Sequence, residues 1–88
     1  MNDEKKNKVL EMNEDYNGGI IVRHSNGRFT NAEIIRRAVE NNTLSVKKVI
    51  ATIKRYGYDS DFFYNNPRRY ILLTIHKMLD MGQVKLIA

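Results

Sequence analysis

The sequence lacks cysteine altogether. Neither a disulfide nor a thiolate metal site can therefore stabilise the fold, and stability must come from an apolar core. A chain of 88 residues forms one domain, and a domain of this size buries only about 60–65% of the surface that its unfolded form exposes. The hydrophobic content of 42% is enough for a packed core and too high for a fully disordered chain.

Long hydrophobic runs are also missing. The longest aliphatic stretches are three residues, such as 20–22, whereas a membrane-spanning helix needs about 20 apolar residues. The N-terminus is polar and of mixed charge, so it does not have the apolar segment of a secretory signal. We therefore expect a soluble, cytoplasmic protein that has no membrane partner.

Signatures of catalysis and metal binding are scarce. His24 and His76 are the only histidines, and no metal-type spacing links them to each other or to carboxylates. The chain has no glycine-rich phosphate loop, no nucleophile elbow and no paired-carboxylate signature. We predict a binding protein rather than an enzyme, with no cofactor and no metal ion.

Acidic residues are few outside the N-terminal region. Residues 1–19 carry three basic and five acidic side chains, whereas residues 20–88 carry twelve basic and five acidic ones, a net charge of +7. A basic domain attracts polyanions through the summed field of its surface. This charge favours nucleic acid as the partner, although many basic proteins bind no polyanion.

The chain divides into two parts. Residues 1–19 are predicted to form a flexible N-terminal tail, because they end in the flexible sequence Asn-Gly-Gly. Residues 20–88 are predicted to form the single folded domain. It begins with a β-hairpin over residues 20–29, in which Asn26 and Gly27 form a two-residue turn and both take positive φ.

Three helices are expected after the hairpin. Thr30 and Glu33 have the spacing of a capping box, in which each side chain bonds the other residue's backbone N–H, and they start a helix over about 31–41. Glu33 and Arg37, four residues apart, are expected to form a pair on the outside of this helix. The next helices run over about 45–56 and 67–81, and Gly82 ends the last one. The predicted core centres on Ile35, Val49, Ile50, Ile53, Ile75 and Leu79.

A short strand over residues 84–87 completes the pattern, and we expect it to pair with residues 20–24. The predicted fold class is therefore α+β and mainly α, a three-helix core with a small antiparallel sheet.

The polar face of the second predicted helix is the strongest functional signal. Between Asn41 and Tyr58 the sequence has no acidic residue. Surfaces that are merely solvated usually mix both signs of charge. We interpret this face as a phosphate-contacting surface, since lysine on a flexible stem reads base edges poorly. Its candidate nucleic-acid-binding residues are Lys47, Lys48, Lys54 and Arg55.

Two further regions supply candidate contacts. The third predicted helix presents an outward face of mixed character, with Arg68 and Arg69 in its first turn, where free backbone amides favour phosphate. The other outward residues are Tyr70, Leu73, Lys77 and Asp80. The predicted hairpin adds Arg23 and Arg28. In an alternative interpretation, Tyr70 and Leu73 are covered by the tail or by the loop over residues 57–66.

From about residue 29 onward, the layout resembles a winged-helix DNA-binding domain. Residues 29–35 resemble the opening of a first helix, and residues 71–87, ILLTIHKMLDMGQVKLI, are similar to a recognition helix that runs into a short strand. The sequence departs from the family in two ways. The link over residues 57–66 is long, and the C-terminal wing hairpin is missing, so the hairpin over 20–29 would have to replace it.

The winged-helix resemblance implies that the third helix enters the major groove of duplex DNA, with Arg68, Arg69, Tyr70, Leu73 and Lys77 as its contacts. We predict a small basic regulator that binds nucleic acid. The ten asparagines are typical of an AT-rich genome, such as that of a bacteriophage or an AT-rich bacterium. The alternative is an adaptor or inhibitor of another protein, or a homodimer, that uses Tyr70, Leu73 and Arg69 as its interface.

Overall fold

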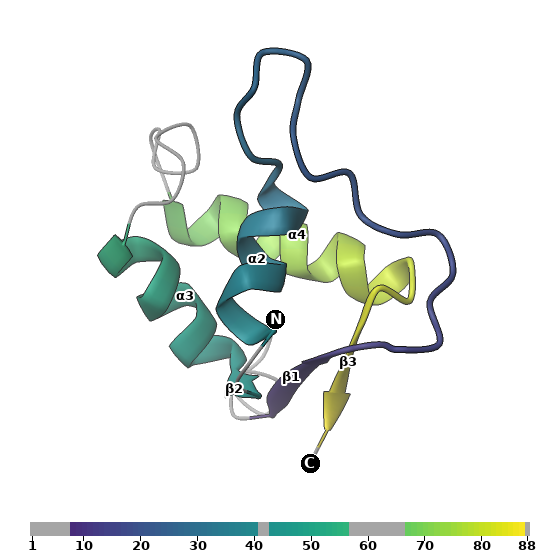
Figure 1. Ribbon diagram of the computed structural model, residues 1–88. Helices are drawn as coiled ribbons and strands as arrows, with labels where there is room; N and C mark the ends of the chain where they lie inside the picture. The colour runs from purple at the N-terminus through teal and green to yellow at the C-terminus, as the bar shows by residue number, and fades with distance from the viewer. Residues whose placement is uncertain (1–7, 41–42, 57–66, 88) are drawn as a thin grey trace.

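The computed structural model describes residues 8–40, 43–56 and 67–87. Figure 1 shows the helices packed together above a small sheet, with the segment between the first strand and the first helix extending beyond them. The fold is α+β and mainly α, which confirms the predicted class. The elements in chain order are β1 (Val9–Met12), α2 (Asn31–Val39), β2 (Leu44–Ser45), α3 (Val46–Tyr56), α4 (Pro67–Asp80) and β3 (Val84–Ile87).

The sheet has β1 at its centre, in the order β2-β1-β3, and both pairings are antiparallel. Leu10 lies opposite Leu44 on one side and Leu86 on the other, and it is fully buried. The prediction of a flexible tail is therefore wrong for residues 9–12. A four-residue strand gives little periodicity, and its pairing partners lie far away in the sequence.

The last strand, β3, pairs with β1. The prediction that it pairs with residues 20–24 is therefore wrong. Met12 lies opposite Val84. Beyond the strand, the Asn13 backbone N–H donates to the carbonyl oxygen of Gln83 at 3.0 Å, and the Asn13 side chain donates to that of Gly82 at 2.8 Å. The N-terminal strand therefore occupies the hydrogen-bonding edge that residues 20–24 were expected to occupy.

Residues 20–29 fold back on themselves, but they do not form the predicted β-hairpin, because only an isolated bridge between Arg23 and Phe29 joins the two arms. The turn also differs from the prediction. The turn has three residues, 25–27, since the His24 N–H donates to Arg28 at 2.8 Å and the Gly27 N–H donates to His24 at 2.9 Å. Gly27 takes a positive φ of 86°. Asn26 does not, because no described residue other than glycine has positive φ; its side chain instead accepts from the Arg28 N–H at 3.0 Å.

Only one of the two hydrogen bonds of the predicted capping box forms at the start of α2. The Glu33 N–H donates to the Thr30 hydroxyl at 3.1 Å, as expected of an N-cap. The reciprocal bond is absent, because the Thr30 N–H donates to Val22 at 3.0 Å and the Glu33 carboxylate is bonded to arginines. The Thr30 hydroxyl also donates to Ile21. These bonds fasten residues 21–22 to the beginning of α2.

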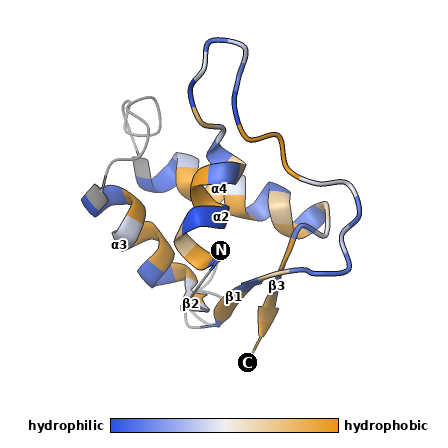
Figure 2. Ribbon diagram, in the orientation of Figure 1, coloured by the Kyte–Doolittle hydropathy of each residue, from blue (hydrophilic) through white to orange (hydrophobic). Residues whose placement is uncertain are grey.

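The buried faces of α3 and α4 have the phase that the sequence predicts. Every member of the predicted core is buried except Leu79, which is half-buried against it. Figure 2 shows apolar and hydrophilic stretches alternating along α3 and α4, as expected of helices with one buried side. Gly82, with φ 78°, ends α4: its N–H donates to Leu79, and the next N–H donates to Met78, a pattern typical of a Schellman motif.

Candidate nucleic-acid interface

The outward side of α3 carries four cations, Lys47, Lys48, Lys54 and Arg55, which we call the α3 basic face. All four side chains are exposed, as predicted. They avoid the buried side of the helix, where Val49 and Ile53 are fully buried. The Lys48 N–H donates to the Ser45 hydroxyl at 3.2 Å, which caps the helix at its start. Since α3 contains no acidic residue, the α3 basic face carries one sign of charge.

The outward side of α4 is also exposed. Tyr70 is 41% exposed and Leu73 is 49% exposed. Within the described part of the chain nothing buries either side chain, and the loop over residues 57–66 lies outside the described residues. The exposed cations of this side are Arg68, Arg69 and Lys77. We call Arg68, Arg69, Tyr70, Leu73 and Lys77 the α4 outer face.

The turn before α2 places Arg23 and Arg28 in the segment that extends beyond the helices (Figure 1), and both are exposed. Arg23 is fixed in place. Its Nη1 donates to the carbonyl oxygen of Gly27 at 2.7 Å, and its guanidinium lies 4.1 Å from the centroid of the Phe29 ring. The backbones of Arg23 and Phe29 also form an isolated β-bridge.

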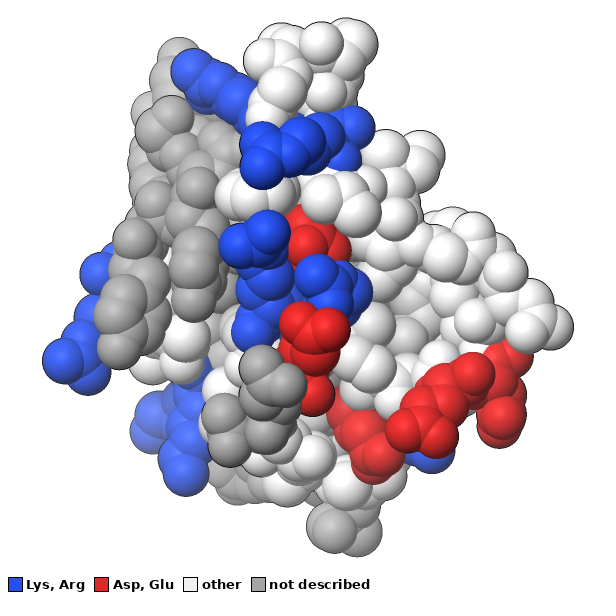
Figure 3. All heavy atoms as spheres, in the orientation of Figure 1, with Lys and Arg blue, Asp and Glu red and all other residues white. Residues whose placement is uncertain are grey.

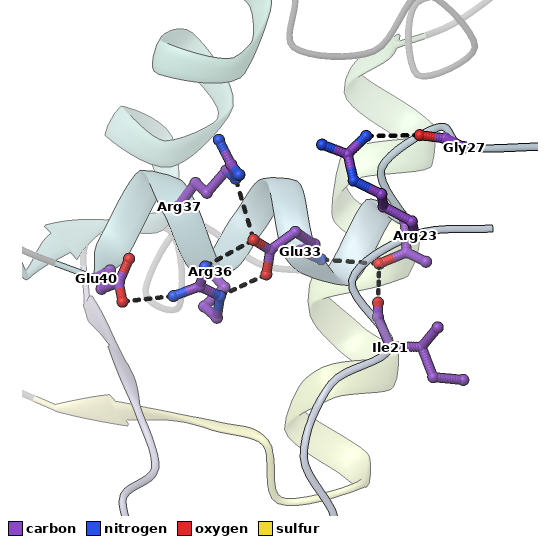
Figure 4. A network of polar contacts seen from close by, with 8 residues as sticks. Ile21, Arg23, Gly27, Glu33, Arg36, Arg37 and Glu40 are labelled. Atoms are coloured by element: carbon purple, nitrogen blue, oxygen red, sulfur yellow. Dashed lines mark hydrogen bonds and ion pairs between the residues drawn. The ribbon is translucent and has the colours of Figure 1, made fainter.

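A second arginine contacts the same ring from α2. The guanidinium of Arg37 lies 4.0 Å from the Phe29 centroid. Figure 4 shows the guanidinium groups of Arg23 and Arg37 directed toward the same space between the turn and α2. Phe29 itself packs against the core and is half-buried. The ring therefore joins the base of the protruding turn to α2 through two cation–π contacts.

Glu33 holds two arginines on α2. Its carboxylate accepts hydrogen bonds from Arg36, one of them at 2.6 Å, and from Nε of Arg37 at 3.0 Å (Figure 4). Arg36 also forms an ion pair with Glu40. The sequence pattern predicts an outward-facing pair of Glu33 with Arg37; the pair forms, but Glu33 is only 1% exposed because the arginines cover it.

The arginines change the acidity of this carboxyl group. The hydrogen bond from Arg36 is the main reason that the pKa of Glu33 lies below its ordinary value of 4.5, and Arg37 acts in the same direction, whereas burial acts in the opposite one. The same bond raises the pKa of Arg36 above its ordinary value. Glu33 is therefore ionised at neutral pH, and its ionised form stabilises the folded protein.

We expect Glu33→Gln to lower the free energy of unfolding by about 1–3 kcal/mol at pH 7, because it removes the charge from a buried acceptor of charged hydrogen bonds. Solvent around the two partly exposed arginines keeps the loss below that of a fully buried pair. The lowered pKa of Glu33 means that this contribution is present above about pH 4.5 and is lost as the pH falls through the folded-state pKa. Urea unfolding at pH 7 and pH 3 tests this expectation. A difference between wild type and variant that is the same at both pH values would contradict it.

Charge is unevenly distributed over the surface. Figure 3 shows one group of acidic side chains over β1 and the segment that follows it, and basic side chains over the turn, α2 and α3, with the acidic side chains of α2 among them. The acidic residues of the first region are Glu11, Glu14 and Asp15. These three acidic residues make the region of β1 less favourable for an anion than the exposed face of α3.

The structure brings some of the predicted residues together and adds two that the sequence analysis does not identify. Arg23 from the predicted hairpin meets α2 through Phe29 and Arg37, and neither of these two is among the sequence candidates. Helices α3 and α4 pack against each other. The only sequence signal for the stack is an aromatic residue directly before the N-cap of α2.

Among the residues that the structure describes, no three histidine or acidic side chains are grouped closely enough to hold a metal ion. The described helices are also too short or too polar to cross a membrane. In comparisons with protein-family models, curated proteins and solved structures, nothing matches this chain.

Proposed function

We propose that this protein is a small cytoplasmic regulator that binds nucleic acid, with duplex DNA as its target. The observation that carries the proposal is the α3 basic face, a helix surface of four exposed cations with no acidic residue on the helix. Phosphate contacts of this kind supply most of the affinity for DNA and fix the position of a protein on the duplex. The acidic side chains of β1 and of the segment that follows it form a separate group in Figure 3.

The order of the elements supports a role for α4 in the same interface. From α2 onward the chain runs helix, strand, helix, helix, strand, an order that resembles the first part of a winged-helix domain. The sheet position beside β3 is filled by β1 from the other end of the chain. By this analogy α4 is the recognition helix, Arg68 and Arg69 lie at its start, and the protruding turn takes the place of a wing.

The test is a matched pair of double variants. Lys47→Ala with Lys54→Ala removes two charges from the α3 basic face, whereas Lys8→Ala with Lys85→Ala removes two charges from the strand region. We expect the first pair to weaken binding to a labelled duplex about tenfold and to reduce the slope of log K against log [salt] by about 0.9 for each lost contact. The second pair should change both quantities much less. Equal effects of the two pairs would show that only the total charge matters.

A protein partner is the second candidate function, and the α4 outer face favours it. Tyr70, Leu73 and Lys77 follow one another at helical spacing along one side of α4, and Met81 comes four residues later, just beyond the end of the helix. Tyr70, Leu73 and Met81 are large exposed apolar residues. Exposed apolar side chains in one row are typical of protein interfaces. Such an interface depends much less on salt than phosphate binding does, so titrations at two salt concentrations separate the two functions.

A further inference from the structure

The stack of Arg23, Phe29 and Arg37 has the properties of a preformed anion site. Both guanidinium groups lie within 4.1 Å of one ring centroid. The central carbons of the two guanidinium groups are therefore at most about 8 Å apart.

Each guanidinium is held by one hydrogen bond and keeps further donors available. Arg23 donates to the Gly27 carbonyl oxygen, and Arg37 donates through Nε to Glu33. A guanidinium has five N–H donors, and neither guanidinium group forms another hydrogen bond within the described part of the chain. Because stacking and one bond already fix each group, the remaining donors lose little conformational entropy when they bind a ligand.

The local balance of charge favours an anion. Glu33 and Glu40 offset two of the three arginines in this region, Arg36 and Arg37. Arg23 has no carboxylate partner among the described residues, and it contacts the same ring as Arg37. Two cations held this close repel each other, and an anion bound at their outer edges relieves the repulsion.

We propose that Arg23 and Arg37 form a clamp for the phosphate groups of a nucleic-acid backbone. This inference rests on the proposed function and assigns it a site outside α3 and α4. The planar fork of each guanidinium matches the oxygens of a phosphate group, which makes arginine the preferred residue for such contacts. The clamp joins the protruding turn to α2, so a bound backbone would fix the turn against the body of the protein.

The decisive variant replaces both arginines by lysine, Arg23→Lys with Arg37→Lys. It keeps both positive charges but removes the planar guanidinium groups, and with them the paired N–H donors and the stacking on the Phe29 ring. We expect binding to a labelled 20-base-pair duplex to weaken about tenfold. Arg36→Lys is the matched control, because Arg36 lies on the same helix, is held by Glu33 and Glu40 and does not contact the ring; its affinity should stay within about twofold of wild type. Thermal melts verify that both variants fold.

Phe29→Leu gives an independent variant, since it keeps an apolar side chain at the edge of the core and removes the ring. If the ring positions the two guanidinium groups, this change weakens duplex binding although both arginines are present. Wild-type affinity in both Phe29→Leu and the double lysine variant would overturn the clamp, because a general basic field depends on neither the fork nor the ring.

NMR of the arginine side chains separates failure of the clamp from failure of the proposed function. Inorganic pyrophosphate serves as a probe that contains no nucleoside. If the protein binds no duplex but pyrophosphate shifts the Arg23 and Arg37 resonances selectively, the result supports the phosphate site and contradicts the nucleic-acid function. In the opposite case the protein binds the duplex, the Lys47→Ala and Lys54→Ala double variant binds it more weakly, and neither the duplex nor pyrophosphate shifts these two resonances. That result supports the nucleic-acid function and contradicts the clamp.

Discussion

Replacing Leu10 by alanine should lower the free energy of unfolding by about 2–5 kcal/mol, the usual range for a fully buried leucine. Leu10 is 0% exposed and lies in the central strand, between residues of β2 and β3. The same strand packs against α2. The cavity would therefore open where the sheet meets the helices. For a domain of this size the loss is a large share of the total stability, which is typically about 5–15 kcal/mol.

Glu11→Ala is the matched control for this substitution. Glu11 is the next residue of the same strand and is not buried, because successive side chains of a strand point to opposite faces. Its replacement should change the free energy of unfolding by less than about 0.5 kcal/mol. Urea denaturation of both variants makes the comparison. A loss below about 1 kcal/mol for Leu10→Ala would mean that the first strand frays from the sheet and that residues 1–19 are a tail after all.

The helices could be predicted from the sequence because the information that defines them is local. In α3, the apolar residues recur at intervals of three and four. This single row of apolar residues predicts both the bounds of the helix and its buried side. The predicted start of α3 at residue 45 differs by one residue from the observed start at Val46. The cap at Thr30 and the stop at Gly82 are local signals as well.

The sheet could not be predicted in the same way, because its pairing depends on residues far apart in the chain. Val9 pairs with Ser45 on one side and with Ile87 on the other. The β-branched run at residues 20–22 gives a stronger strand signal than residues 9–12, yet it lies outside the sheet and is fastened to the N-terminus of α2. A long-range partner thus outweighs local strand propensity here.

For the candidate site too, the features that depend on local sequence could be predicted, and those that depend on contacts between distant residues could not. Lys47 and Lys54 are exposed as predicted, because any residue away from a correctly phased apolar stripe faces solvent. The contact of Arg37 with Phe29 depends on where the turn before α2 packs, so helical periodicity carries no information about it. Glu33 is the clearest case: its position on the helix predicts an exposed pair, but Arg36 and Arg37 both fold over it and bury it.

Leu73→Glu should leave the protein folded and reduce duplex binding about a thousandfold. The residue is 49% exposed on the α4 outer face, so a carboxylate there stays hydrated in the free protein. If α4 enters the major groove, the same carboxylate meets phosphates on both sides, and contact between like charges costs several kcal/mol. About 4 kcal/mol corresponds to that loss of affinity.

Leu73→Gln is the control that separates charge from shape, because glutamine has nearly the same size as glutamate and no charge. Binding that is retained in Leu73→Gln and lost in Leu73→Glu, with a loss that shrinks as salt is added, identifies phosphate repulsion and places α4 against nucleic acid. Normal duplex binding in both variants means that α4 stays outside the complex and that the α3 basic face contacts the backbone without it. If the wild-type protein self-associates in sedimentation and both variants dissociate equally at low and high salt, the α4 outer face is an apolar interface between protein chains.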